Sequence, residues 1–275
     1  MESQGSTRDE TLKPLNLSDT FKGPEGRIVL NEGERLDDLQ INGLHIIQNK
    51  DRFCFGIDAV LLSGYAVVKK GETVLDIGTG TGVIPILLTA KTEGAHFTGI
   101  EIQKDSAELA KRNAALNGLS GIVDIICGDI RDCRDILPSN SVNVITSNPP
   151  YMINRHGLTG ESFEKAAARH EILCTFEDIA RESKRILKEK GRIYLIHRPF
   201  RLADVFESLK KYSLEPKRLR MVQPYIDKEP SMVLIEAVKG GRPGLKVEKP
   251  LVIYKELNVY TQEVYEIYGK RGLNV

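Results

Sequence analysis

A glycine-rich turn between an apolar strand segment and an apolar helix limits most strongly what this chain can fold into. The run Thr73–Ile77 is mostly apolar and partly β-branched, which predicts a buried strand. Gly78, Gly80 and Gly82 follow at alternate positions, and the apolar stretch behind them predicts a helix with Pro85 in its first turn. A strand, a glycine turn and a helix in this order predict a small-molecule pocket at the carboxyl end of a parallel strand.

The residues of this turn narrow the kind of ligand. The spacing Gly78-x-Gly80-x-Gly82 differs from the G-x-G-x-x-G spacing that cradles a pyrophosphate. Asp76 stands just before the turn, and a carboxylate there would repel phosphates but suit a ligand that carries an ammonium group. The alternative is a structural turn that binds nothing, and the flanking strand and helix argue against it.

Two further predicted strands end near acids that suit a nucleoside. The segment His96–Glu101 predicts a second strand, and Glu101 lies about 20 residues after the turn, where α/β nucleotide sites place a carboxylate on the ribose hydroxyls. A third predicted strand, Ile122–Cys127, is followed by Asp129, which can reach an adenine amino group. A loop aspartate that caps the segment Arg131–Leu137 is the alternative, and the residues leave both interpretations of Asp129 open.

The most specific signal is Asn148-Pro149-Pro150-Tyr151, directly after a fourth predicted strand at Val142–Thr146. The prolines keep Asn148 extended and lack N–H groups, so the Asn148 side-chain oxygen and the Pro149 carbonyl form a rigid pair of acceptors. Such a pair suits an amino group with two donors, and Tyr151 adds a flat face for stacking. Holding both protons frees the nitrogen lone pair for attack on an electrophilic carbon, where positioning supplies most of the rate. A simple turn is the alternative, and the placement at a strand end argues against it.

The remaining segments alternate between strands and helices. Thr175 and Asp178 resemble a capping box for a helix that runs to Lys190 and ends at Gly191. The other predicted elements are a helix from Lys104 to Asn117, strands at Arg192–Ile196, Leu219–Val222, Met232–Val238 and Leu251–Tyr254, and helices at Leu202–Lys211 and Thr261–Tyr268. This order predicts an α/β fold with a doubly wound sheet and one reversed strand near its edge.

Length and composition favour one α/β domain with appendages, since 41% of the 275 residues are hydrophobic. Residues 1–30 are expected to be a flexible N-terminal extension, residues 31–240 the main domain, and residues 241–275 a C-terminal strand and helix appendage that packs on it. A strand pair is expected between Glu34 and Asp51. Asp58 is expected to cap a helix, and contact with the ligand is its other interpretation.

Composition also argues against some classes of protein. No run approaches about 18 apolar residues, so no membrane span is expected, and the polar N-terminus lacks the apolar core of a signal peptide. The four cysteines show no C-x-x-C spacing, so we expect no metal site and reduced thiols in a cytoplasmic protein. Net charge is −6 over residues 1–150 and +7 over residues 151–275. A basic second half can follow a phosphate backbone, and ordinary solvated helix surface is the alternative.

Together these motifs resemble the class I S-adenosylmethionine-dependent methyltransferases that methylate amino groups. The resemblance covers about residues 34–239 and implies a Rossmann-like, seven-stranded, mostly parallel sheet with an antiparallel seventh strand. It implies that Glu101 binds the ribose of S-adenosylmethionine, that Asp129 binds its adenine, and that Asn148, Pro149 and Tyr151 hold the target amine. The implied cofactor-binding set is Asp58, Asp76, Gly78, Thr79, Gly80, Gly82, Glu101, Ile102, Asp129, Ile130 and Asn148.

Further motifs resemble a narrower group, the bacterial enzymes that methylate the N6 of the adenine beside the anticodon of valine tRNA. These motifs are Phe55 to Leu62, Ala168 to Glu171, His197 to Pro199 and Tyr260 to Tyr265. The resemblance implies a tRNA partner in the cytoplasm, and a monomer is the expected state. A structural role is the alternative for both histidines among the candidate RNA contacts, which are Arg155, Arg169, His170, His197, Arg198, Arg201, Arg218 and Arg220.

Rival functions use the same residues. The acceptors at Asn148 would also serve a release-factor glutamine or an N2 amine of guanine in ribosomal RNA. The glutamine enzymes carry a helical N-terminal domain, for which residues 1–50 are too short and polar. A cofactor- and RNA-binding module without turnover is a further alternative, and the intact Asn148 and Tyr151 argue against it. Tight NAD binding without methyl transfer would instead indicate an oxidoreductase.

Overall fold

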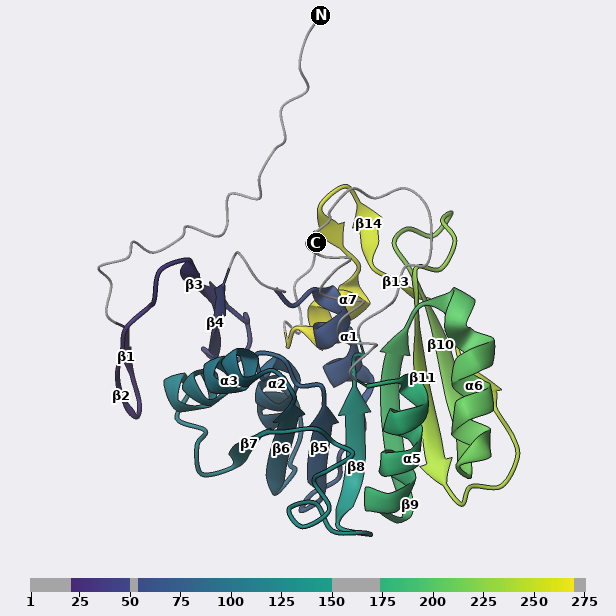
Figure 1. Cartoon of the computed structure of the whole chain (residues 1–275). Helices are drawn as coiled ribbons and strands as arrows, with labels where there is room; N and C mark the ends of the chain where they lie inside the picture. Colours follow the sequence, from purple (N-terminus) through teal and green to yellow (C-terminus); the bar gives the residue numbers. More distant parts are fainter. Residues whose placement is uncertain (1–20, 50–53, 150–173, 270–275) are drawn as a thin grey trace, which may run out of the picture.

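A mainly parallel β-sheet organises the part of the chain that the computed structural model describes, which is residues 21–49, 54–149 and 174–269 (Figure 1). Within these residues the sheet has nine strands in the order β12-β10-β11-β9-β8-β5-β6-β7, with β13 also paired to β10. The strands are β5 (Thr73–Ile77), β6 (His96–Glu101), β7 (Val123–Cys127), β8 (Val142–Ser147), β9 (Leu187–His197), β10 (Leu214–Gln223), β11 (Met232–Lys239), β12 (Lys246–Val247) and β13 (Leu251–Val252).

The pairing pattern confirms the predicted Rossmann-like arrangement. Strands β7, β6, β5, β8 and β9 pair in parallel, whereas β11 is antiparallel to both β9 and β10. The seven long strands β5 to β11 therefore form a mostly parallel sheet whose seventh strand is reversed. The short strands β12 and β13 extend its edge in parallel with β10.

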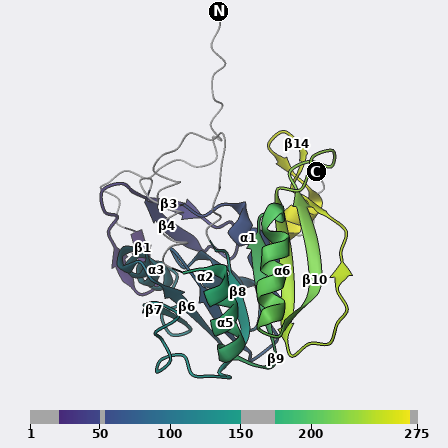
Figure 2. The same cartoon turned by 45° about the vertical axis from the view of Figure 1, so that its right-hand side comes forward.

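Helices cover both faces of the sheet (Figures 1 and 2). They are α1 (Ile57–Tyr65), α2 (Val83–Lys91), α3 (Lys104–Leu116), α5 (Phe176–Ile186) and α6 (Leu202–Lys211). Because side chains alternate across a strand, Val74 and Val144 join the core under α1, α2 and α3, while Leu75 and Ile145 join the core under α5 and α6. These two cores make the fold doubly wound, as predicted.

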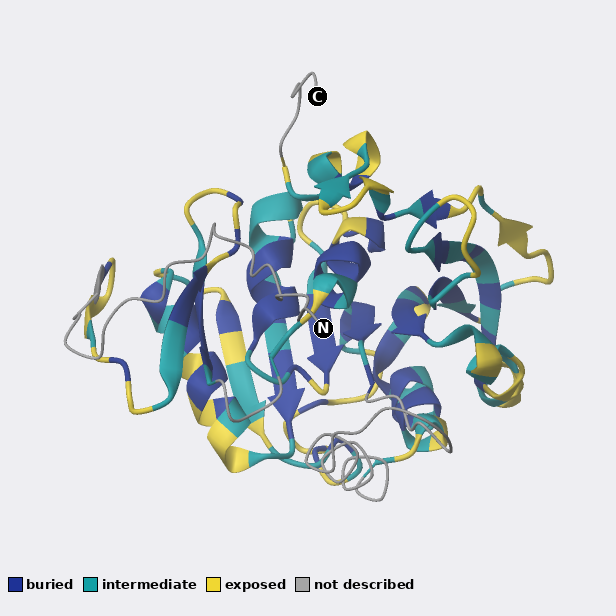
Figure 3. Cartoon of the chain, turned by 90° about the horizontal axis from the view of Figure 1, so that it is seen from above, coloured by how far each residue is buried: buried dark blue, intermediate teal, exposed yellow. Residues whose placement is uncertain are grey.

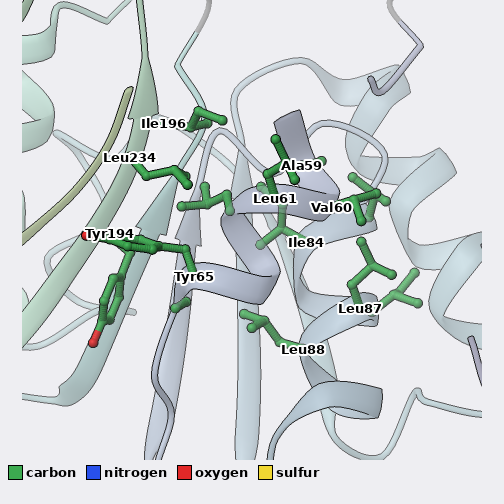
Figure 4. Close-up of a cluster of buried hydrophobic side chains, with 14 of the residues drawn as sticks. Ala59, Val60, Leu61, Tyr65, Ile84, Leu87, Leu88, Tyr194, Ile196 and Leu234 are labelled. Atoms are coloured by element: carbon green, nitrogen blue, oxygen red, sulfur yellow. The ribbon is translucent and has the colours of Figure 1, made fainter. Parts of the chain in front are cut away.

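One cluster of buried hydrophobic side chains lies where α1 and α2 meet the sheet. Figure 4 shows side chains of these helices facing Tyr194, Ile196 and Leu234 on the strands. Leu61 of α1 and Leu87 of α2 are fully buried. Seen from above, buried residues occupy the middle of the molecule and exposed residues its rim (Figure 3). Helix α1 is thereby fixed beside the carboxyl end of the central strands.

Short elements flank the sheet at both ends of the chain. They are the hairpins β1 (Phe21–Gly23) with β2 (Gly26–Ile28), β3 (Glu34–Asp38) with β4 (His45–Asn49) and β14 (Tyr254–Glu256) with β15 (Val259–Tyr260), the 3-10 turn η1 (Pro199–Arg201), and α7 (Gln262–Ile267). No helix among the described residues is long and apolar enough to cross a membrane.

The β1–β2 hairpin corrects the expectation of a flexible extension for residues 21–28. It docks on the end of α3, where Glu25 accepts a hydrogen bond from the Ser120 N–H at 3.1 Å. A Cβ on Gly23 would come within 2.7 Å of the Leu116 carbonyl oxygen, so the backbones are in close contact. The β1–β2 hairpin is held by contacts with α3 and the loop after it. Residues 21–28 alone therefore show no periodic pattern that would predict the hairpin. Residues 1–20 lie outside the described residues.

Two predicted helix ends are wrong. Helix α1 begins at Ile57 with Gly56 at its N-cap, and Asp58 does not cap it because its carboxylate makes other contacts. Helix α5 has the predicted capping box of Thr175 and Asp178 but ends at Ile186, where β9 begins. Gly191 lies inside β9 rather than after a helix, and a Cβ there would meet the Lys188 carbonyl oxygen at 2.8 Å.

Candidate active site

The glycine turn after β5 folds back onto the end of β6. The N–H groups of Gly78 and Thr79 donate to the Ile100 carbonyl at 2.9 and 3.1 Å, and the Gly80 N–H donates to Glu101 Oε2 at 2.9 Å. Gly78, Gly80 and Gly82 have φ values of 71°, 56° and 81°, which favour glycine. A Cβ added at Gly78 or Gly80 would meet no atom within 4 Å. The turn therefore exposes bare backbone to an open space.

Asp76 lies under this turn with an unsatisfied oxygen. Its side chain is fully buried, and Oδ1 accepts a hydrogen bond from the Thr146 hydroxyl at 2.7 Å. Neither Asp76 Oδ2 nor Thr79 Oγ1 has a hydrogen-bond partner among the described residues. Burial raises the pKa of Asp76 to about 7. The nearby hydroxyls of Thr146 and Thr79 oppose the shift, and the negative charge of Glu101 adds to it. An unpartnered carboxylate oxygen beside open backbone fits the ammonium group of an amino-acid ligand.

Thr146 is a contributor that the sequence analysis missed. It lies directly opposite Asp76 in the parallel register of β5 and β8. A hydroxyl residue near the end of the fourth strand was the available signal, but only strand pairing shows which acid it contacts.

Glu101 is held at the end of β6 by two backbone N–H groups. Its side chain is buried, and Oε1 accepts from the Gln103 N–H while Oε2 accepts from Gly80, both at 2.9 Å. Each carboxylate oxygen has a second lone pair that can accept a ribose hydroxyl. Ile102 follows directly and is half-buried. The predicted ribose acid and the glycine turn thus form one connected unit.

The predicted adenine acid is engaged by its own loop. Asp129 accepts hydrogen bonds from the backbone N–H and the guanidinium of Arg131, and this guanidinium holds the pKa of Asp129 below its usual range. Ile130 is buried in the core with Cys133 and Leu137. The loop-capping interpretation therefore describes these contacts, and adenine contact by Asp129 stays a prediction.

The structure joins two site residues that the sequence left separate. Asn148 follows β8, and its Nδ2 donates to Asp58 Oδ2 on α1 at 3.0 Å. The other oxygen of Asp58 accepts from the Ala59 N–H at 2.9 Å. With its NH2 end turned toward Asp58, the Asn148 amide presents its oxygen as an acceptor. Pro149 is buried beside it, whereas Tyr151 lies outside the described residues.

The histidine among the described RNA candidates is not on the surface. His197 is buried, and its Nδ1 accepts from the Arg198 N–H at 2.8 Å. Burial lowers the pKa of His197 to about 4, which keeps the ring neutral near pH 7. These contacts support the structural interpretation of this residue. The predicted RNA contacts Arg155, Arg169 and His170 lie outside the described residues.

The described arginines differ in their surroundings. Arg198 and Arg201 lie on the turn that follows β9, where Arg198 donates to the Ser231 carbonyl and Arg201 pairs with Asp204. Arg218 is partly buried and pairs with Glu236 and Glu248. Arg220 pairs with Glu263 of α7 at 2.6 Å.

No group of three or more histidine, cysteine or acidic side chains in the described part of the chain is arranged to hold a metal ion. The described site instead consists of two units at neighbouring strand ends. One is the glycine turn with Asp76 and Glu101, and the other is the pair of Asp58 and Asn148. The first suits an amino acid joined to a nucleoside, and the second suits an amine with two protons.

Comparison with known proteins gives the same picture. A family described as a methyltransferase domain matches residues 68–244. A tRNA1(Val) (adenine(37)-N6)-methyltransferase from Porphyromonas gingivalis is 33% identical over 66% of this chain and 72% of its own length. A protein of the same name from Histophilus somni is 29% identical over 80% of this chain and 90% of its own length. The crystal structure of a predicted O-methyltransferase from Agrobacterium tumefaciens superposes with a TM-score of 0.63 at 21% identity, covering 78% of this chain and 97% of that one.

Proposed function

The chain belongs to the methyltransferase family that includes the tRNA1(Val) (adenine(37)-N6)-methyltransferases, and from this membership we propose that it methylates the exocyclic N6 of an adenine in tRNA. The methyl donor is S-adenosylmethionine. The adenine next to the anticodon of a valine tRNA is the target that the relatives' names support.

One observation carries the assignment of the reacting group. Asn148 Nδ2 donates to Asp58 Oδ2 at 3.0 Å, which turns the NH2 end of the amide toward α1 and makes the amide oxygen the acceptor for a substrate amine. An amine with two donors is complementary to that oxygen together with the Pro149 carbonyl. A hydroxyl or carboxylate substrate would not use both acceptors, so this set of acceptors favours methyl transfer to an amino group.

The cofactor half of the site follows from the glycine turn. When bound, S-adenosylmethionine supplies a methyl group on a positively charged sulfur. Asp76 would pair with the ammonium group of its amino-acid part through Oδ2, and Glu101 would accept the ribose hydroxyls. Asn148 and Pro149 hold the adenine N6 so that its lone pair points at the carbon to be attacked. The N6 nitrogen gives up its proton only after it becomes cationic, so no residue needs to act as a base beforehand.

Transfer of labelled methyl groups tests this function. Purified protein with radiolabelled S-adenosylmethionine should label bulk tRNA, and nucleoside mass spectrometry should identify N6-methyladenosine. Asn148→Ala should lower the rate at least 100-fold while the cofactor still binds. Label in ribosomal RNA or release factor but not in tRNA would show that the substrate is one of these molecules and not tRNA. Full activity of Asn148→Ala on tRNA would contradict the proposed role of the asparagine.

A further inference from the structure

One exposed aromatic side chain lies on the turn η1, which follows β9, the strand next to β8 and Asn148. Phe200 of η1 is 66% exposed, and it is the single exposed aromatic residue among the side chains that the structure describes. Aromatic rings contribute strongly to binding when they are buried, so an exposed phenylalanine beside the proposed site is available for contact with a partner.

The place of this turn ties it to Asn148. In the parallel pair β8–β9, Ser147 lies opposite Leu195, so both strands end at the same edge of the sheet. Asn148 follows the first strand, and η1 begins two residues after the second. In Figure 1 the arrow of β8 points toward the edge from which the chain passes into α6. Phe200 therefore follows a strand end at the same edge of the sheet as Asn148.

The turn is held in place by contacts on both sides of Phe200. Arg198 Nη1 donates to the Ser231 carbonyl at 2.9 Å, which joins the turn to the start of β11. Arg201 donates its backbone N–H to the Arg198 carbonyl at 3.1 Å and its side chain to Asp204 at 2.7 Å. Pro199 fixes the backbone between them. A fixed aromatic ring costs less entropy on binding than a mobile one.

We propose that Phe200 stacks on an unpaired base of the tRNA next to the target adenine, with Arg198 and Arg201 supplying positive charge toward the neighbouring phosphates. This inference rests on the proposed function and names how the same site holds its RNA. A single-stranded RNA loop is the partner that matches the surface, because its splayed bases offer flat apolar faces and its backbone offers negative charge. The target adenine leaves its stack to reach Asn148. The Phe200 ring then stacks on the base that was next to this adenine.

Two exposed apolar side chains continue this surface away from Asn148. Ile226, on the turn between β10 and β11, is 77% exposed, and Leu257, between β14 and β15, is 79% exposed. The rings of Tyr225 and Tyr254 pack at 5.5 Å and join these two turns. Both turns lie at the edge that Phe200 occupies, since β10 ends and β13 pairs with it there. Ile226 and Leu257 are therefore further exposed apolar side chains at the same edge of the sheet as Phe200.

A tryptophan reporter tests the stacking directly, because the chain contains no tryptophan. Phe200→Trp places a single indole on the turn. Ile136→Trp is the matched control, since Ile136 is 61% exposed and lies at the opposite edge, next to Leu137, whose carbonyl contacts Arg185 at the end of α5. An anticodon stem-loop RNA should quench the Phe200→Trp emission and leave the Ile136→Trp emission unchanged. A fully paired RNA duplex should quench neither.

Kinetics give a second measurement. Phe200→Ala should raise the KM for tRNA roughly 10-fold and leave cofactor affinity and thermal stability unchanged, while Phe200→Tyr keeps the ring and the wild-type KM. Ile136→Ala should behave like the wild type. An unchanged KM in Phe200→Ala, or RNA that binds without quenching Phe200→Trp, would overturn the proposal.

The two proposals fail in different ways. A wild-type protein that methylates no tRNA would refute the proposed function, yet the fluorescence measurement would still decide whether Phe200 meets an unpaired base. Quenching that depends on protein concentration in the absence of RNA would show that a second copy of the chain covers this surface, and it would refute the RNA assignment.

Discussion

At the scale of single residues, the fold buries the Asp76 carboxyl group. Burial opposes the negative charge that this group would need to pair with an ammonium group. Burial raises its pKa to about 7 from an ordinary value of 3.8. A protonated carboxyl does not attract an ammonium group, so affinity for S-adenosylmethionine should fall as the pH drops below about 7. Calorimetric titration of the cofactor between pH 5 and pH 8 measures this. An affinity independent of pH over this range would exclude Asp76 as the partner of the ammonium group.

The variant Asp76→Asn separates binding from folding. Between about pH 4 and 7, Asp76 keeps its proton in the folded wild type but loses it in the unfolded chain. The contribution of Asp76 to the free energy of unfolding therefore becomes more favourable as the pH falls and is least favourable above about pH 7. Asp76→Asn should therefore unfold at a higher temperature than the wild type at pH 8 and at a similar temperature at pH 4. Its cofactor affinity should be roughly 10- to 100-fold lower, because a charge-assisted contact is lost.

Asp58 acts on the reacting amine through Asn148. In Asp58→Ala the Asn148 amide loses the acceptor that orients it, so kcat should fall about 10-fold while the cofactor Kd stays within about 2-fold. Asp58→Asn keeps an oxygen acceptor and serves as the matched control, with activity between the two. A raised cofactor Kd with unchanged kcat would show that Asp58 contacts the cofactor, which was its other interpretation.

At the scale of elements, Gly191 lies inside β9 at a point where backbone atoms of β8 and β9 come close to it. A Cβ at this position would lie 2.8 Å from the Lys188 carbonyl oxygen and 3.1 Å from the Asn143 carbonyl oxygen, both of which are backbone atoms that cannot move aside freely. Gly191→Ala should lower the free energy of unfolding by about 1–3 kcal/mol, measured by urea denaturation. Gly121→Ala is the control, because a Cβ there meets nothing within 4 Å. Equal effects of the two variants would contradict the packing argument.

At the scale of the whole molecule, Arg218 joins the last long strands to α1 and to the C-terminal segment. It pairs with Glu236 and Glu248, each at 2.9 Å, and lies over the Tyr65 ring at 4.3 Å from the centroid. Arg218→Met leaves the buried Glu236 without its partner, so the free energy of unfolding should fall by about 1–3 kcal/mol. Lys211→Met, which breaks an exposed pair with Glu177, should cost less than about 1 kcal/mol.

The same variant tests the RNA expectation for Arg218. If its charge only holds the fold together, Arg218→Met protein that remains folded should bind tRNA with a Kd within about 2-fold of the wild type, measured by filter binding at one salt concentration. If folded Arg218→Met protein binds tRNA more than about 2-fold more weakly than the wild type, Arg218 contacts the RNA.

The sequence by itself determined the order and type of the main elements, and it predicted the chemistry of the site. The predicted bounds of β6 and α6 match the structure, because each has a local apolar pattern and a clear end. Glycines before a helix and acids at strand ends predict a nucleoside ligand, because both signals can be read from neighbouring residues in the chain. The order of the elements predicted one reversed strand near the edge of the sheet, and the family resemblance identified it as the seventh strand.

Only the tertiary structure decided which of these residues meet. Asn148 and Asp58 are 90 residues apart in the chain, and Asp76 meets Thr146 across 70, so no local pattern contains either pair. The burial of His197 and the role of Gly191 likewise depend on neighbouring strands. The physical reason is that propensity and hydrophobic period act over a few residues, whereas hydrogen bonding, burial and pKa depend on groups that folding brings together from distant segments.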